Sequence, residues 1–128
     1  MNKLIGAMVL ALLPGMAAAE GFYSRDVGEG GSPEACLSRA RQAVETYARQ
    51  NGTPNAIVVQ GAWSLSGYDL YPGQVDVQVA CPYRDNIASI VVVTGHSDGN
   101  EADRITVIEG IGAIWDQLGQ GGAPAATK

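Results

Sequence analysis

The chain has 128 residues, and its 13 acidic and 8 basic side chains give it a net charge of −5. The basic residues are scattered along the chain, which argues against nucleic acids and anionic membrane surfaces as partners, because both require clustered positive charge. The length fits one domain with a modest core.

The first residues have the pattern of a secretory signal peptide. Lys3 precedes an apolar run over residues 4–13, and small residues follow up to Ala19. A positive charge, a short apolar run and an A-x-A site in this order are typical of a cleaved export signal. A membrane span needs about 20 apolar residues, so this run is too short to be one. We therefore expect cleavage near Ala19, removal of residues 1–19, and a bacterial periplasmic or secreted protein that does not stay in the membrane.

Residues 20–31 are rich in glycine and charge, and we expect them to form a flexible N-terminal arm. A helix is predicted to begin after Ser32, because serine is a good N-cap and Pro33 suits the first helical position. Asn51–Gly52 is predicted to end it. The apolar positions recur at helical spacing. The predicted buried face consists of Cys36, Ala40, Ala43, Val44 and Tyr47.

Three strands are predicted next, over residues 56–65, 74–81 and 87–94. The first two alternate between apolar and polar positions, which indicates strands with one buried face. The predicted core positions of the first are Ile57, Val59, Trp63 and Leu65. Those of the second are Val75, Val77, Val79 and Cys81. The third is apolar on both faces, which indicates a covered strand.

A second helix is predicted to follow Asn100, a good N-cap, and to end at Leu118. Gly110 and Gly112 lower its helix propensity, so we expect them to allow close contact with a neighbouring element. Acidic residues in its first turn suit the positive end of the helix dipole. Residues 119–128 have the composition of a disordered tail. Residues 32–118 therefore form the single predicted domain.

The order of elements predicts an α+β fold. Short connections favour a three-stranded antiparallel meander, and both amphipathic helices are expected to cover the same face, giving a two-layer sandwich. Cys36 and Cys81 both lie on predicted inner faces, and we expect them to form a disulfide in an oxidising compartment. Two cysteines and one histidine fall short of a closed zinc site, so we expect neither a metal nor a cofactor.

His96 is the one histidine, and it lies between a predicted strand and the second helix. A cleft formed by His96, Arg84 and Asp98 would allow general-base chemistry, and this is the small hydrolase-like or ligand-binding alternative. The neighbouring Ser97 cannot act with His96 and Asp98 as a triad, because three consecutive residues do not converge. A surface-loop histidine without a role is the simpler interpretation.

Three aromatic residues near predicted loops are binding candidates: Trp63, Tyr68 and Tyr71. They fit equally well at the edge of a core. The uncovered sheet face is expected to carry Gln60, Ala62, Ser64, Asp76, Gln78, Ala80, Ser89 and two of the valines from 91 to 93. Exposed valines there would favour a homodimer, which is a further alternative.

The small size, the expected disulfide and the absence of a catalytic motif favour a non-enzymatic interaction module. We expect the partner to be another exported protein or a second copy of the chain.

Overall fold

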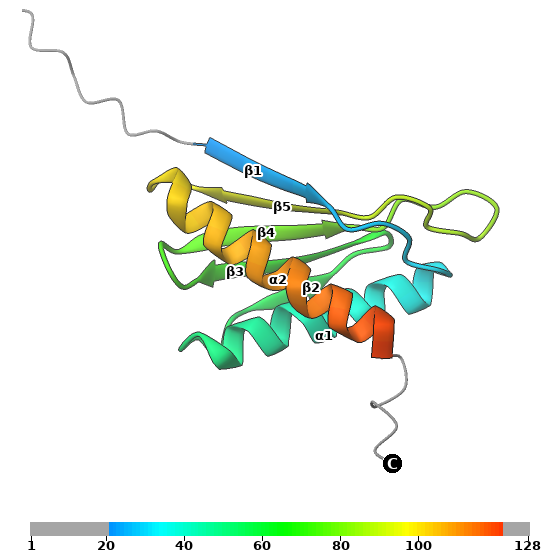
Figure 1. Ribbon diagram of the computed structural model, residues 1–128, viewed down its shortest axis with the longest axis horizontal. Coiled ribbons are helices and arrows are strands. Elements are labelled where there is room, and N and C mark those ends of the chain that lie inside the picture. Colours follow the sequence, from blue (N-terminus) through cyan, green and yellow to red (C-terminus); the bar gives the residue numbers. More distant parts are fainter. Residues whose placement is uncertain (1–20, 122–128) are drawn as a thin grey trace, which may run out of the picture.

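The computed structural model describes residues 21–121. Its elements are β1 (Gly21–Asp26), α1 (Pro33–Gln50), β2 (Val58–Gln60), β3 (Ser64–Leu70), β4 (Val75–Ala80), β5 (Val92–Ser97) and α2 (Glu101–Gly121). The strands form one antiparallel sheet in the order β1-β5-β4-β3-β2 (Figure 1). The α+β prediction is confirmed, but the sheet has five strands rather than three. The predicted signal peptide and residues 122–128 of the predicted tail lie outside the described residues.

The first helix begins and ends where its capping residues predict. The Ser32 hydroxyl accepts a hydrogen bond from the Ala35 N–H at 3.2 Å, and Pro33 occupies the first turn. The C-cap is Asn51, and Gly52 follows with φ of 79°. Glycine adopts this left-handed conformation without a steric penalty, so the helix ends here. The predicted inner face is buried along its whole length.

The second helix also follows its predicted cap. The Asn100 side chain accepts from the Asp103 N–H at 2.9 Å. Gly110 lies against α1: a Cβ placed on it would come within 2.5 Å of the Tyr47 ring. The close approach expected of Gly110 is therefore confirmed. The helix continues to Gly121, beyond the predicted end at Leu118.

The predicted flexible arm contains a strand within its described part, residues 21–31. Gly21–Asp26 forms β1 at the edge of the sheet and pairs antiparallel with β5. Its ladder places Ser24 opposite Thr94, far away in the chain. Because the partner is so distant in sequence, the glycine-rich composition gave no local sign of a strand.

The single strand predicted over residues 56–65 is wrong. The chain forms the short β2, turns at residues 61–63 and returns as β3. The Gly61 N–H donates to the Ser64 carbonyl at 2.8 Å and closes this turn. As a result Leu65 is buried as predicted, whereas Ile57, Val59 and Trp63 are exposed. A turn inside an alternating pattern breaks its period, so positions before and after the turn need not share one face.

The third strand was predicted too early in the chain. β5 begins only at Val92, and residues 81–91 form a long connection between β4 and β5. Ile87 and Ile90 are exposed on this connection, whereas Val91 and Val93 are fully buried. Only Val92 of the three valines lies on the uncovered sheet face. The exposed valine run that motivated a homodimer surface is therefore absent from this face.

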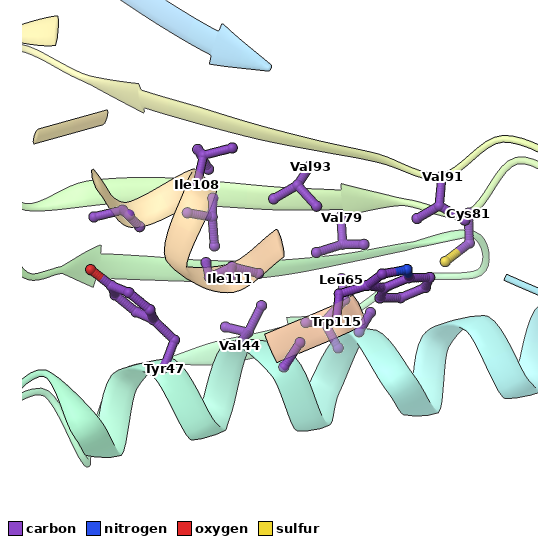
Figure 2. Packing of buried hydrophobic residues seen from close by; sticks show 14 of the residues in the cluster. Val44, Tyr47, Leu65, Val79, Cys81, Val91, Val93, Ile108, Ile111 and Trp115 are labelled. Carbon is purple, nitrogen blue, oxygen red and sulfur yellow. The ribbon is translucent and has the colours of Figure 1, made fainter. Parts of the chain in front are cut away.

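Both helices cover the same face of the sheet, as predicted. Val44 of α1 lies over Gly67, and Ile108 of α2 lies over Gly95; both glycines pair with Val77 of the central strand. Figure 2 shows the side chains between the two layers, with Val79 and Val93 of the sheet facing Ile111 and Trp115 of α2. The core is one continuous cluster.

The predicted Cys36–Cys81 disulfide is confirmed. It joins the first turns of α1 to the chain just after β4, with the two Cα atoms 6.2 Å apart. Both cysteines are fully buried. A structural disulfide of this kind is typical of proteins in oxidising, extracytoplasmic compartments.

Candidate functional site

The predicted cleft of His96, Arg84 and Asp98 does not form. Arg84 lies in the connection that precedes β5, and His96 lies near the end of β5, so the length of the strand separates them. The Arg84 guanidinium is almost fully exposed, and its described ion-pair partner is the adjacent Asp85 at 4.0 Å. His96 and Arg84 therefore cannot contact one small substrate together, and Arg84 cannot assist His96 as a general base.

His96 and Asp98 do share a hollow, which lies at the end of the sheet opposite Arg84. This polar hollow of about 430 Å³ is also lined by Asp69 and Asp76. The described contact of the His96 ring is with Phe22, at 4.8 Å between ring centroids. The Ser97 hydroxyl lies on the buried side, 3.3 Å from the Arg104 guanidinium. No nucleophile and base are therefore paired here.

No metal site accompanies these carboxylates. Over residues 21–121, no three His, Cys, Asp or Glu side chains are grouped so as to hold an ion. The carboxylates after β5 serve the helix instead, because Glu101 and Asp103 lie in the first turn of α2.

The connection between β4 and β5 forms the most prominent projection of the molecule. We call residues 82–90 the finger; it extends beyond the ends of the neighbouring strands (Figure 1). At its tip, Arg84 and Ile87 exchange two backbone hydrogen bonds of 3.0 Å each. Asp85 and Asn86 between them both have positive φ, of 52° and 62°. Two such residues in a tight hairpin are the signature of a type I′ turn.

The base of the finger is fixed on both sides. Cys81, just before it, is held to α1 by the disulfide. On the return side, the Ala88 N–H donates to the Gly31 carbonyl at 2.7 Å, and the Val91 N–H donates to the Gly28 carbonyl at 2.8 Å. Ala88 and Val91 are fully buried. The finger is thus a hairpin with a rigid base and a short free tip.

Large apolar side chains are exposed on this hairpin and beside it. Their exposed fractions are 51% for Trp63, 53% for Tyr83, 52% for Ile87 and 57% for Ile90. Trp63 belongs to the group because it lines a shallow hollow with Pro82 and Tyr83. We call Trp63, Pro82, Tyr83, Ile87 and Ile90 the finger patch. Exposed apolar groups that cluster on a fixed backbone mark interaction sites.

The three aromatic binding candidates lie in three different places. Trp63 is in the finger patch, not in the core as its strand pattern predicted. Tyr68 lies on the uncovered face of the sheet. Tyr71 is exposed in the turn between β3 and β4, where its carbonyl accepts from the Tyr47 hydroxyl at 2.9 Å. They therefore do not form one surface.

Sequence reasoning missed Tyr83, Ile87 and Ile90 as site residues. The available signal was Asp85–Asn86, a pair that favours a hairpin tip. The third strand was predicted to begin at Ile87, directly after this pair, so Ile87 and Ile90 were assigned to the sheet. Once the turn is recognised, the apolar residues beside it fall on an exposed hairpin.

Three residues that join separate elements of the fold have shifted pKa values. Burial raises the pKa of Tyr47. The hydrogen bond from Tyr23 to Glu109, 2.7 Å long, raises the pKa of that tyrosine. Burial lowers the pKa of Arg39, which lies 4.0 Å from the centre of the Trp115 ring. Tyr23 joins β1 to α2, Tyr47 joins α1 to the β3–β4 turn, and Arg39 joins α1 to α2.

Comparison of the chain with protein-family models, curated proteins and solved structures finds no match. Within residues 21–121, neither helix is long and apolar enough to cross a membrane.

Proposed function

We propose that this chain is a non-enzymatic, exported binding module that engages another protein through the finger patch. The observation that carries the proposal is a hairpin with a fixed base, whose exposed Tyr83, Ile87 and Ile90 lie together with the exposed Trp63 of the β2–β3 turn. Tryptophan and tyrosine are enriched among the residues that dominate binding energy. A backbone fixed before binding loses little conformational freedom on association.

The shape and charge of the finger define the partner surface. The hairpin projects, so it fits a concave surface rather than a flat one. Arg84 and Asp85 at the tip carry opposite charges and lie beside each other. The tip is therefore nearly neutral, and the complementary cleft is apolar with a polar rim. The occupant we propose is a different folded protein in the same compartment.

Two features support the proposed location. The disulfide is consistent with an oxidising compartment. The signal-peptide pattern before Ala19 supports export, to the periplasm or beyond the cell in a bacterium. A partner would be met after export, once the disulfide has formed.

The test compares two variants with matched residue types. Tyr83→Ser with Ile87→Ser removes two members of the finger patch, and Tyr71→Ser with Ile57→Ser is the control at the opposite end of the sheet. The control residues are at least as exposed, at 64% and 66%. Immobilised oxidised chain from residue 20 onward is exposed to extracytoplasmic extract, and the retained protein is purified for direct titration.

We expect the wild-type chain and the control to bind the purified partner equally. Loss of about 2 kcal/mol at a hot spot corresponds to roughly 30-fold weaker binding by the finger variant. Equal binding by all three proteins would contradict the proposal, as would failure to retain any protein. Sedimentation that shows a finger-dependent dimer would make a second copy the occupant and would also overturn it.

A further inference from the structure

The uncovered face of the sheet holds a second, chemically different feature. Alternate side chains of β1, β3, β4 and β5 point away from the helices here, and they surround a hollow of about 240 Å³. We call it the aromatic hollow. The residues used below are Phe22, Tyr68, Asp76, Gln78, Thr94 and His96, all of which line it.

The register of the sheet assembles these residues. His96 pairs with Phe22 on one side and with Asp76 on the other, so the three form a row across β1, β5 and β4. Gln78 pairs with Thr94 in the next outward-facing row. Directly paired positions have Cβ atoms about 5 Å apart, so neighbouring side chains can contact one small molecule together. The positions of these residues are therefore determined by strand pairing and not by the conformation of a loop.

Phe22 is the most exposed large apolar residue that the structure describes, at 73%. Its ring lies against that of His96 with an interplanar angle of 40°. Tyr68 adds a second exposed aromatic ring, at 40%. Leaving these apolar surfaces in water is unfavourable, so a ligand that covers the two rings is favoured by the hydrophobic effect.

The polar groups beside the rings favour a ligand with several hydroxyl groups. The Asp76 carboxylate accepts hydrogen bonds, the Gln78 amide donates and accepts, and the Thr94 hydroxyl does both. No lysine or arginine lines this hollow or the adjoining polar hollow, which argues against phosphate and other anions. β3, β4 and β5 each have a hydrogen-bonded strand on both sides, so their backbone is not available to pair with an added peptide strand.

We propose that the aromatic hollow binds one ring of a neutral oligosaccharide. A pyranose has an apolar C–H face that packs on an aromatic ring, while its hydroxyls form hydrogen bonds with carboxylate and amide groups. The volume lies below the about 300 Å³ at which pockets for drug-sized ligands begin, and so suits one ring. Asp76 and His96 also line the polar hollow, which provides space for the next sugar unit. This site uses none of the finger patch, so either proposal can fail without the other.

The test is titration of the oxidised, isotope-labelled chain with maltotetraose, cellotetraose and N-acetylchitotetraose, followed by backbone amide NMR. We expect at least one of these neutral oligosaccharides to shift the signals of residues 22, 76, 78, 94 and 96, and not those of the finger. Phe22→Ala should weaken that binding at least tenfold, and Asp76→Asn at least threefold. Tyr83→Ala, an exposed tyrosine outside the hollow, should leave it unchanged.

Asp76→Asn separates ligand binding from a structural effect. The Asp76 carboxylate accepts from the Asp69 N–H at 3.0 Å, and an asparagine oxygen can keep this bond. Both variants should retain the melting temperature of the wild-type chain. The proposal is overturned if none of the three oligosaccharides shifts these signals at millimolar concentration, or if Phe22→Ala binds as tightly as wild type. The same titration with spermidine, a polycation, and with an oligogalacturonate, a polyanion, tests charged ligands. The proposal is equally overturned if only one of these charged molecules shifts the signals.

Discussion

At the finger end of the sheet, apolar side chains project from a hairpin whose base a disulfide and backbone pairing hold in place. At the opposite end, polar and aromatic side chains line hollows that lie directly on the strands or at their tips. The first surface is convex and nearly neutral, and the second is concave and acidic. The comparison shows that two chemically different surfaces remain exposed, one on the connection at the finger end and one on the face that the helices leave uncovered.

Substitution of the two tryptophans tests whether the finger patch is surface and not core. Trp115 is fully buried, and its indole N–H donates to the Val27 carbonyl at 3.1 Å. Trp115→Ala should lower the free energy of unfolding by about 3–5 kcal/mol, because it leaves a large cavity. Trp63→Ala should change it by no more than about 0.5 kcal/mol, because the ring is half exposed.

Urea unfolding of the two variants under the same conditions measures the difference. A loss above about 2 kcal/mol for Trp63→Ala would show that the finger patch is part of the core. The proposed binding role of Trp63 would then lose its support.

Removal of the disulfide should affect the finger end more than the opposite end. The bond closes a loop with a sequence separation of 45, for which the chain-entropy model gives about 4 kcal/mol. The paired substitution Cys36→Ala and Cys81→Ala should lower stability by about this amount in urea unfolding.

Hydrogen exchange of the same variant then compares the two ends directly. Amides of residues 81–91 should lose protection before those of the β3–β4 turn. Uniform loss of protection at both ends would contradict the idea that the disulfide specifically fixes the base of the finger.

A smaller effect is expected at Tyr47, which joins α1 to the opposite end of the sheet. Its hydroxyl donates to the Tyr71 carbonyl at 2.9 Å, so Tyr47→Phe should cost about 1 kcal/mol at neutral pH. Burial raises the pKa of Tyr47 above the ordinary value of 10.0. The folded state therefore favours the neutral phenol, and this contribution to stability is lost as the pH rises through the folded pKa.

Unfolding of wild type and Tyr47→Phe at a series of alkaline pH values tests the sign. The stability advantage of wild type should shrink above about pH 10. An advantage that grows with pH would mean that the tyrosinate is stabilised in the folded state, contrary to its buried position.

The elements that could be predicted from sequence carry their own local signals. Ser32 and Asn100 cap their helices as expected, and the alternation of residues 74–81 identifies the central strand β4. The helix after Ser32 and the strand over residues 74–81 place Cys36 and Cys81 on inner faces that lie opposite each other, and this predicted their disulfide. In each case the deciding interaction lies within a few residues or follows a strict period.

The missed features depend on partners that are remote in the sequence. β1 is a strand only because β5 lies beside it, and Trp63 is exposed only because the chain turns at Gly61. The predicted convergence of His96 and Arg84 failed because a whole strand separates them. The candidate surfaces were therefore less predictable than the core, since tertiary pairing decides what remains exposed.

The pairing of β1 with β5 also determines when the sheet can be completed. Its ladder joins Ser24 to Thr94, whose side-chain hydroxyls lie 2.9 Å apart across 70 positions of the chain. β1 is synthesised first, but it can pair only after β5, the last strand, has been made. Such non-local contacts form slowly. A nascent chain therefore cannot finish this sheet before Ser97, the end of β5, has been made. For a polypeptide that crosses a membrane unfolded, such a delay would keep it competent for translocation until its final strand is available.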